Sequence, residues 1–564
     1  MTRPTPFFVL TFALAAVAWG QIRSENYQWL LQNAAQLSGD PIPQGKCGLP
    51  AFSALYQTAV KHQELAALFK ATVQRPQLPL SYVTPDRRFR IHYAVTGADS
   101  VNPASTIPEA VAAGVPDYIY ETGVAAQRAQ QLLVTTLGFD PPMSDRGVDG
   151  PEYDFYVDNR PGSEYGRTEW DFLDVSGRAP GYSFVDNDFV GYNTTGLAAL
   201  RVTVAHEYFH GVQLNYRFHG EDIFFLEMSS VWFEDFAYDQ VNDYYFYLRD
   251  FFNNPDRALH ETDGYESAIW LHYLVKRLRT SRIMLDLWKN AKLEPAIRSF
   301  KTVLESSPYK ELFAPSPSPF SQAFSEFYNW CYFTGRRADS SRYFEEGANY
   351  PPIKIAQTLA VSRDMSIDGA LPSAAAQFYR LIRNPQNIQV FLQTGEPSRW
   401  LVTTISRNSQ QYILQNGGGL TPITVAAPAR EDSVVVAVVN VSLPSSSGQT
   451  IFFNYQLLIN LTGQFQIVSM LEKPRPNPYR GGRDNKIVFP FHIDQRMPVN
   501  AVILREDGKV IKSYKFADLG AGFHSELLSW DGRDGSGNRV ASGVYFLRLM
   551  AGNFHQTAKF VVVN

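Results

Sequence analysis

Cysteine is nearly absent from this chain of 564 residues, which contains only Cys47 and Cys331. Two cysteines cannot form a disulfide framework that holds a fold together, and they are too few for a zinc site built from thiolates. In an exported chain they could pair with each other and tie the N-terminal region to the end of the helical part. Sequence alone does not give their separation, so this pairing stays open.

Long basic runs are also missing, and the formal net charge is -4. Nucleic-acid-binding proteins carry clustered positive charge, so we expect no nucleic-acid partner. The chain instead has 45% hydrophobic and 19% charged residues, with 39 Phe and 30 Tyr. This composition argues against general disorder, and the length exceeds what one hydrophobic core usually organises. The sequence therefore predicts several folded domains.

Apolar runs long enough to cross a membrane are the third absence. A transmembrane helix needs roughly 20 apolar residues, whereas the run after Arg3 extends only from Phe7 to Ala18, just before Trp19-Gly20. This pattern is typical of a secretory signal peptide at residues 1–20, with a membrane anchor as the alternative. We expect a mature protein without a transmembrane segment that is secreted, either extracellular or at the cell surface.

The pattern of the chain changes near residue 89. Residues 21–88 include a helical stretch at Tyr56–Val73 and are expected to form an N-terminal extension or pro-segment. Residues 89–345 combine strand-like alternation with helical periodicity, which predicts an α+β domain. Its expected elements are strands at Arg90–Val95, Tyr153–Val157 and Tyr182–Phe189 and a helix at Ile107–Leu137.

Short alternating runs fill the rest of the chain and predict two all-β domains. Residues 350–470 contain runs such as Gln377–Ile382 and Ser433–Val441, which are typical of a β-sandwich. A proline-rich linker follows Lys473, and strands and turns occupy residues 474–564. The glycines at positions 532, 535 and 543 lie in expected turns, where they can supply positive φ angles.

The chemistry is indicated by one helical stretch that contains His206, Glu207 and His210. Histidines at positions i and i+4 lie on one face of a helix, one turn apart, and this spacing suits a tetrahedral zinc ion. Glu207 would then act as general base on a water molecule and return the proton to the leaving amine. Chance occurrence of the motif is the alternative, but the chain has only ten histidines and the neighbouring side chains are uncharged.

A catalytic zinc ion needs a third protein ligand and one open position. Glu227 is the favoured candidate, on an expected second helix at Phe225–Asp235. Glu234 lies seven residues later on nearly the same face, so it is either the hydrogen-bond partner of a ligand or the ligand itself. Asp222 and His219 are further alternatives.

The sequence from Glu227 to Asp235 has the form E-x-x-S-x-W-x-E-D. With the preceding HExxH helix, it resembles the gluzincins, zinc peptidases that include thermolysin and the large aminopeptidases, and it is most similar to secreted bacterial metallopeptidases. The metzincin pattern is absent, because Gln213 and Tyr216 stand where that pattern has Gly and His. Met228 replaces the Gly of the aminopeptidases, so their specificity is not implied.

The resemblance covers roughly residues 89–340 and implies a zincin-like catalytic domain with Zn2+ as cofactor. It implies His206, His210 and Glu227 as zinc ligands and Glu207 as general base. Tyr265 resembles the tyrosine with which related enzymes stabilise the oxyanion, and it is expected on the following helical segment. A core aromatic is the alternative reading of Tyr265, and His272 is a weaker candidate for the same role.

The last ninety or so residues resemble the Ig-like domain of flagellar hook-capping proteins and the sorting domains of type IX secretion. That resemblance implies export or attachment to the cell surface, without chemistry of its own. The matching residues are Asn477-Pro478, Asp507-Gly508-Lys509, Trp530-Asp531-Gly532 and Gly543-Val544-Tyr545.

The sequence thus predicts a multidomain chain, with an α+β zincin-like catalytic domain followed by two all-β sandwich (Ig-like) domains. Its expected function is that of a secreted zinc-dependent peptidase acting on a protein or peptide substrate. One alternative is a surface adhesin, or a glycan- or protein-binding protein, with an inactive zincin-like domain. A structural zinc site is less favoured, because such sites are closed by four protein ligands and are usually rich in cysteine.

Overall fold

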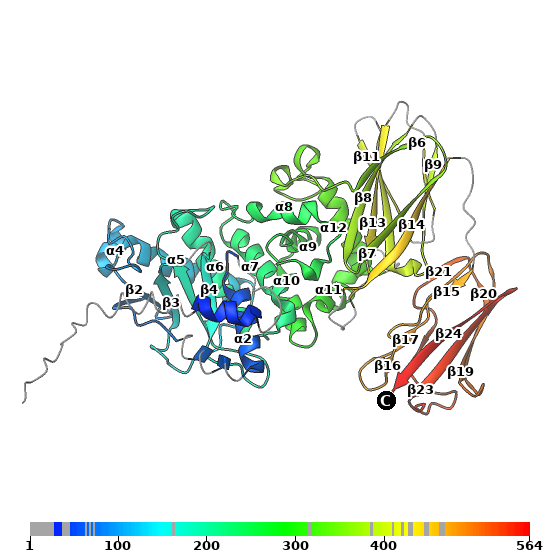
Figure 1. Ribbon diagram of the computed structural model, residues 1–564, viewed down its shortest axis with the longest axis horizontal. Coiled ribbons are helices and arrows are strands. Elements are labelled where there is room, and N and C mark those ends of the chain that lie inside the picture. Colours follow the sequence, from blue (N-terminus) through cyan, green and yellow to red (C-terminus); the bar gives the residue numbers. More distant parts are fainter. Residues whose placement is uncertain are drawn as a thin grey trace, which may run out of the picture. The chain divides into compact units, whose positions relative to one another are not determined.

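The computed structural model divides the chain into two compact units, which are described separately. The first unit comprises the described residues up to Phe251 together with His260–Val303, and the second comprises Phe252–Leu259 and the described residues from Leu304 onward. The structure describes residues 27–36, 45–62, 65–66, 69–70, 74–160, 164–313, 318–383, 387–408, 411–418, 422–426, 432–444, 450–461 and 469–564 (Figure 1). The expected signal peptide lies outside these residues.

A five-stranded mixed sheet organises the first unit. Its three central strands run parallel, and both edge strands run antiparallel to their neighbours. The strand order is β1 (Leu80–Val83), β2 (Phe89–Tyr93), β3 (Tyr153–Asp158), β5 (Gly181–Asp186) and β4 (Gly166–Trp170). Because β1 precedes residue 89, the sheet begins inside the range predicted as an N-terminal extension.

The stretch predicted as one helix at Ile107–Leu137 is divided in the structure. Helix α4 (Pro108–Ala113) ends at Gly114, which has a φ of 70° and provides a left-handed cap. Helix α5 (Asp117–Gln130) begins after Pro116 and continues into a π-helical turn, η1 (Gln131–Thr136). The single-helix prediction was therefore wrong, because the cap at Gly114 and the fixed φ of Pro116 interrupt the helix.

Helix α6 (Gly196–Leu214) carries both histidines of the motif and is buried at almost every position from Ala199 onward. It packs against β4 and β5 on one side and against α5 and α7 (Ile223–Ala237) on others. A sequence whose only acidic and basic residues besides histidine are Arg201 and Glu207 suits this position, since a charged side chain on most faces would lose its hydration without gaining a partner. The lack of charge around the motif correctly predicted a buried helix.

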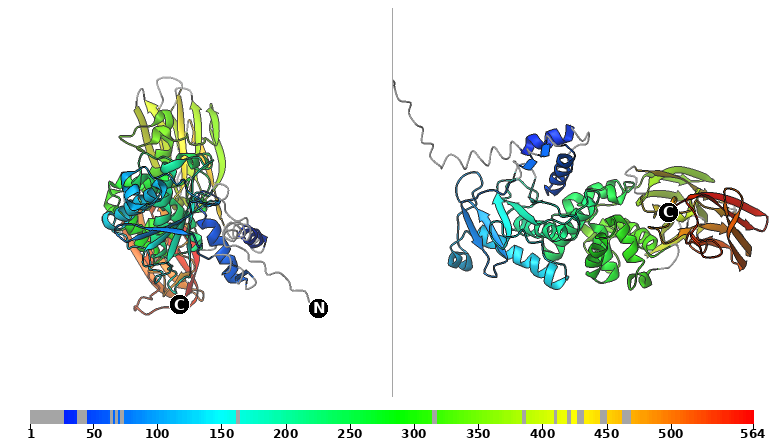
Figure 2. Two further views of the ribbon diagram at one scale, coloured as in Figure 1. Left: turned by 90° about the vertical axis from the view of Figure 1, so that its left-hand side faces the viewer. Right: turned by 90° about the horizontal axis from the view of Figure 1, so that it is seen from below.

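The N-terminal residues form a small helical pair beside this sheet. Helix α2 (Leu49–Lys61) and the helix at residues 27–36 lie close together (Figure 2). They share a hydrophobic cluster that includes Leu30, Leu31 and Leu55. Phe52 of α2 also packs edge-to-face on Trp170 of β4, with ring centroids 4.6 Å apart. The helical stretch predicted at Tyr56–Val73 is confirmed in part: α2 begins earlier, at Leu49, and ends at Lys61, residues 65–66 and 69–70 are also helical, and the other residues from 63 to 73 lie outside the described ranges.

Several further helices follow α7, and the second unit consists mainly of strands after its last described α-helix, α12 (Pro319–Tyr332). Helix α12 packs against a β-sandwich, and the side-chain amide of Asn329 on α12 donates to the hydroxyl of Thr403, 3.2 Å away. The helices are α8 (Tyr245–Asn253), α9 (Ile269–Leu278), α10 (Arg282–Ala291), α11 (Ala296–Leu304) and α12 (Pro319–Tyr332).

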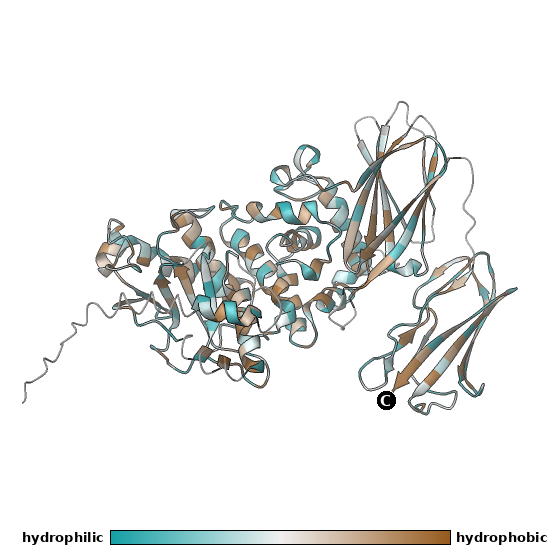
Figure 3. Ribbon diagram, viewed as in Figure 1, coloured by the Kyte–Doolittle hydropathy of each residue, from teal (hydrophilic) through white to brown (hydrophobic). Residues whose placement is uncertain are grey.

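The sandwich consists of a five-stranded and a four-stranded sheet, as the alternating runs predicted. Hydrophobic side chains from both sheets, including Trp400 and Tyr455, form its core, and Figure 3 shows hydrophobic residues along these strands. The first sheet has the order β11 (Gln411–Gly418), β10 (Trp400–Asn408), β13 (Asp432–Asn440), β8 (Ala375–Arg383) and β6 (Gln357–Val361). The second has the order β12 (Ile423–Val425), β9 (Ile388–Gln393), β14 (Phe452–Asn460) and β7 (Met365–Pro372).

The C-terminal module has its own core around Trp530 and Phe560. Gly532 has a φ of 78° and fulfils the expectation of a positive φ angle, whereas Gly535 and Gly543, both among the described residues, do not. The main sheet is β16 (Tyr479–Arg480), β24 (Phe554–Val563), β23 (Gly543–Ala551), β19 (Met497–Arg505) and β20 (Val510–Leu519). Smaller sheets pair β15 (Met470–Leu471), β18 (Phe491–Ile493) and β21 (Gly522–His524), and β17 (Ile487–Val488) with β22 (Ser529–Trp530).

The described residues contain neither a membrane-spanning helix nor a disulfide. Within those ranges, no helix has the length and apolar character needed to cross a bilayer. Cys47 and Cys331 are both buried free thiols, so the disulfide that the sequence left open is not formed in the structure.

Candidate metal centre

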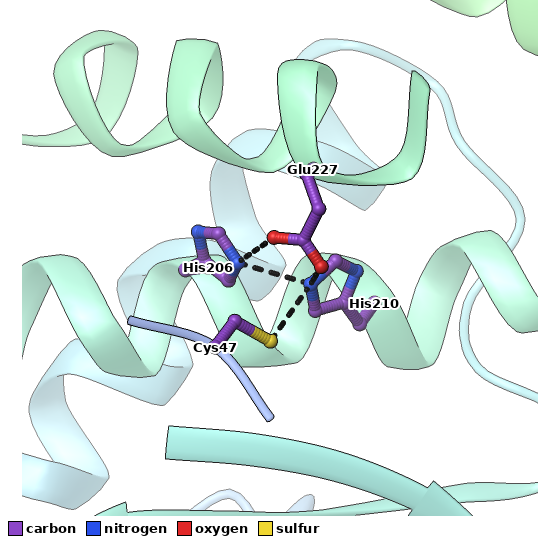
Figure 4. A group of neighbouring side chains, drawn as sticks. All are labelled: Cys47, His206, His210 and Glu227. Carbon is purple, nitrogen blue, oxygen red and sulfur yellow. Dashed lines mark hydrogen bonds and ion pairs between the residues drawn. The ribbon is translucent and has the colours of Figure 1, made fainter. Parts of the chain in front are cut away.

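Four side chains from three separate segments converge in the first unit (Figure 4). His206 and His210 project from α6, Glu227 reaches down from α7, and Cys47 approaches from the segment before α2. One potential ligand atom from each lies within 4.8 Å of the others, and all four residues are buried. The structure therefore brings together the three predicted metal ligands and adds a thiol.

The ring nitrogens that face inward are the Nε2 atoms. His206 Nε2 lies 3.0 Å from His210 Nε2 and 3.1 Å from Glu227 Oε2. Glu227 Oε1 lies 3.4 Å from His210 Nε2 and accepts no hydrogen bond from any described residue. A buried carboxylate oxygen without a donor is costly unless a cation is bound nearby.

The outward-facing ring nitrogens show which tautomers the histidines adopt. His206 Nδ1 lies 2.7 Å from Glu234 Oε1, a carboxylate oxygen that can only accept. His210 Nδ1 lies 2.8 Å from Gln213 Oε1, and the amide nitrogen of Gln213 donates to Leu226 O and to Ser230 Oγ. Both Nδ1 atoms must then be donors, so in the neutral rings both Nε2 atoms present lone pairs to each other.

Two lone pairs 3.0 Å apart, beside a carboxylate, repel one another unless a proton or a metal cation lies between them. The pKa values of the site also show that it favours positive charge between these groups. Burial opposes protonation of His206, but the Glu227 and Glu234 carboxylates raise its pKa to about 10. Burial would raise the pKa of Glu227, yet the two imidazoles hold it well below its usual range. Two imidazoles and a carboxylate suit Zn2+, so the residues present fit the metal that the sequence predicted.

Glu207, predicted as a general base, is not among the four convergent residues. Its carboxylate lies against β4, where the Thr168 hydroxyl donates to Glu207 Oε2 over 2.8 Å. Burial raises the pKa of Glu207, against the opposing effect of the two histidines. Gly166 permits this approach, because a Cβ there would lie 2.9 Å from Glu207 Cγ.

The structure distinguishes Glu227 from the other candidates for the third metal ligand. Glu234 contacts the outer nitrogen of His206, and its second oxygen lies 2.5 Å from Lys46 Nζ, so it supports the histidine from behind. Asp222 accepts a hydrogen bond from the backbone of Ala296. Neither Asp222 nor His219 belongs to the convergent group. Of the alternatives, only Glu227 faces the inner nitrogens.

Tyr265 lies beside the group, in the turn before α9, although the sequence placed it on a helix. Its ring stacks with that of His206 at a centroid distance of 6.2 Å, and its hydroxyl accepts from the Cys47 backbone N–H over 2.9 Å. Burial and the nearby Glu227 carboxylate raise the pKa of Tyr265 well above 10. His272 stacks on Tyr244 instead and does not join the group.

Sequence reasoning missed the residues that support the site from other elements. Gln213 fixes His210, Thr168 fixes Glu207, and Lys46 binds Glu234. For Cys47 the sequence suggested a possible disulfide, and two cysteines were too few for a zinc site built from thiolates. Its position near the N-terminus, far from the motif in sequence, gave no reason to place it beside His210.

Comparisons with known proteins add little. No protein-family model and no curated protein matches the sequence. PorZ, an essential surface component of the type-IX secretion system of Porphyromonas gingivalis, is 20% identical over 19% of this chain and 14% of its own, with a TM-score of 0.13. Latent PorU from the same organism is 11% identical over 37% of this chain and 19% of its own, with a TM-score of 0.18. A β-glucuronidase of Parabacteroides merdae is 12% identical over 33% and 28%, with a TM-score of 0.14. At such scores neither the fold of the whole chain nor its function follows.

Proposed function

We propose that this protein is a zinc-dependent peptidase with a zincin-like catalytic unit. The observation that carries the proposal is the convergence of His206 Nε2, His210 Nε2 and the Glu227 carboxylate, with the tautomers of both histidines fixed from behind. These residues would hold Zn2+, which when bound supplies Lewis acidity toward a peptide carbonyl and lowers the pKa of water.

Glu207 performs the proton transfer in this proposal. Its carboxylate takes a proton from the attacking water and passes it to the nitrogen that leaves. Burial raises its pKa, which makes it a stronger base than a solvated carboxylate. The hydroxyl of Thr168 holds one carboxylate oxygen in place, so the side chain does not have to be ordered during the reaction.

Tyr265 would stabilise negative charge on the substrate in this proposal. Its hydroxyl lies within hydrogen-bond distance of the backbone of residue 47, which runs past the metal-binding side chains. A substrate carbonyl at the same place would receive the hydroxyl proton as a hydrogen bond. The raised pKa keeps the phenol protonated at neutral pH, as a donor requires.

The site is less suited to the alternative roles. An adhesin with an inactive zincin-like domain does not need a buried Glu207 held by Thr168 next to two imidazoles. The C-terminal β-module would serve export or attachment to the cell surface in either case. A secreted peptidase that acts on protein or peptide substrates is the proposal that gives a role to His206, His210, Glu227 and Glu207 together.

Glu207→Gln tests the proposal because it keeps the size and the contact with Thr168 but removes the base. In a Cys47→Ser background, which removes the thiol beside His210, we expect peptide hydrolysis to fall by about 10² to 10⁴-fold while the metal stays bound. Glu121→Gln is the matched control, since Glu121 pairs with Arg201 and does not contact the site. Hydrolysis by Glu207→Gln equal to that of the control would remove the catalytic role.

A further inference from the structure

The segment before α2 occupies the edge of the sheet beside the candidate metal centre. Cys47 forms a parallel bridge with Gly166, the first residue of β4. The backbone N–H of Gly48 donates to Gly166 O over 2.9 Å, and the N–H of Tyr165 donates to Lys46 O over 2.7 Å. Because β4 is an edge strand of the sheet, residues 46–48 take the place where an extended peptide would add as a further strand.

Residues 46–48 also make close contacts beside the metal centre through Lys46 and Gly48. Lys46 is buried, with Nζ 2.5 Å from Glu234 Oε2 and 2.8 Å from Asp243 Oδ2. Gly48 fits closely against the strand, because a Cβ there would lie 2.7 Å from Arg167 Cδ. The segment is therefore held by charge, by backbone hydrogen bonds and by shape.

Between these anchors, the Cys47 thiol faces the inner nitrogens. Its Sγ lies 3.4 Å from His210 Nε2, and the backbone N–H of Leu49 donates to the same sulfur over 3.3 Å. The backbone N–H of Cys47 donates a hydrogen bond to the Tyr265 hydroxyl, so this hydroxyl is not available to a substrate. A thiolate is a strong zinc ligand, and four protein ligands close a tetrahedral site that a catalytic zinc ion needs open.

We propose that Cys47 is the fourth ligand of the metal centre and that residues 46–48 keep the peptidase latent by occupying its substrate edge. This inference rests on the proposed function. The thiol gives up its proton to solvent when it binds the metal and takes one up when it leaves. Departure of residues 46–48 frees the fourth position, the Tyr265 hydroxyl and the edge of β4 together.

The structure also limits what can be removed on activation. Strand β1 and Arg75 belong to the catalytic unit, since Arg75 Nη1 lies 2.8 Å from Asp154 Oδ2 on β3. Cleavage that activates the enzyme should therefore fall after Gly48 and before Arg75, and not near residue 88.

The test uses the full chain in a Cys331→Ala background, which leaves Cys47 as the sole thiol. X-ray absorption at the zinc edge should show a Zn–S distance of about 2.3 Å in Cys331→Ala, and no sulfur in Cys47→Ser/Cys331→Ala. The double variant should keep its zinc, and its peptide hydrolysis should rise from background. Alkylation of Cys47 in the intact Cys331→Ala protein should be slow with zinc and faster after chelation, which tests the ligand without altering residue 47.

Each other outcome has a distinct meaning. Absence of sulfur scattering, with equal hydrolysis by both proteins, overturns the inference and leaves the peptidase proposal standing. Loss of zinc from the double variant makes Cys47 an obligatory ligand of a structural site and overturns latency. A Zn–S contact with no hydrolysis by either protein, even after cleavage between Gly48 and Arg75, contradicts the peptidase function while the ligand assignment stands.

Discussion

Glu234 Oε1 lies 2.7 Å from His206 Nδ1, so a carboxylate on α7 fixes the tautomer of a histidine on α6. Its other oxygen binds Lys46. Glu234→Gln keeps an acceptor for Nδ1 but removes the charge that raises the basicity of the ring. We expect the metal dissociation constant to rise by about 10-fold or more, as such partners typically contribute.

Competition with a chromophoric chelator measures that constant. Asp243→Asn is the matched control, because Asp243 is the second partner of Lys46 and does not contact His206. If both variants weaken metal binding equally, the loss of affinity comes through Lys46 and not through the contact of Glu234 with His206.

Gln213 has the same role for His210 that Glu234 has for His206. Gln213→Leu removes the acceptor of the Nδ1 proton, so the ring can adopt the tautomer with Nε2 protonated and lose its inward lone pair. Metal affinity should fall by about 10 to 100-fold. Ser230→Ala leaves Gln213 Oε1 in place and should have a smaller effect in the same competition assay. The reverse order of the two variants would show that Ser230 orients the ring.

Asp222 gives the protein a pH-dependent stability away from the metal centre. Burial raises the pKa of Asp222 from 3.8 to about 6, although the Ala296 N–H that donates to it opposes the shift. The folded state thus holds this proton more tightly than the unfolded state. The free energy of unfolding contributed by Asp222 is present below pH 3.8 and is lost as pH rises to about 6.

Asp222→Asn keeps an acceptor for Ala296 and removes this titration. Relative to the parent, the variant should gain about 2 to 3 kcal/mol at pH 7 and nothing below pH 4. Urea unfolding at both pH values measures the difference. A gain that is the same at both pH values would contradict ionisation as its cause.

Gly264 brings the turn that carries Tyr265 against α7. It has a φ of 96°, and a Cβ would lie 2.7 Å from Glu227 Cβ. Gly264→Ala should lower stability by about 1 to 3 kcal/mol and should also reduce bound metal, because Glu227 must shift. Gly191→Ala is the control: its φ is 89°, but no atom lies within 4 Å of the added Cβ. Equal metal content in the two variants would show that Glu227 does not move.

The sequence predicted the parts of the site that depend on local periodicity. Helical spacing alone places His206 and His210 on one face, and α6 confirms that geometry. The choice between Glu227 and Glu234 depended on how α7 returns across α6, which no local pattern specifies. The structure brings Glu227 to the inner nitrogens and Glu234 to an outer one.

Strand β4 and its pairing with residues 46–48 could not be predicted from the sequence. β4 was not recognised, because its buried residues include Arg167 and Glu169, whose side chains neutralise each other at 2.8 Å. The pairing of residues 46–48 with its edge joins segments more than a hundred residues apart, and neither period nor composition encodes it.

The most direct test of the account is metal content and peptide hydrolysis of the intact Cys47→Ser protein, before chelation, after it, and after zinc is restored. We predict one equivalent of zinc, hydrolysis that disappears with the metal, and recovery when zinc returns. Hydrolysis that persists without metal, or zinc-loaded protein that cleaves no peptide even after cleavage between Gly48 and Arg75, would contradict the assignment of His206, His210 and Glu227 as the ligands of a catalytic metal.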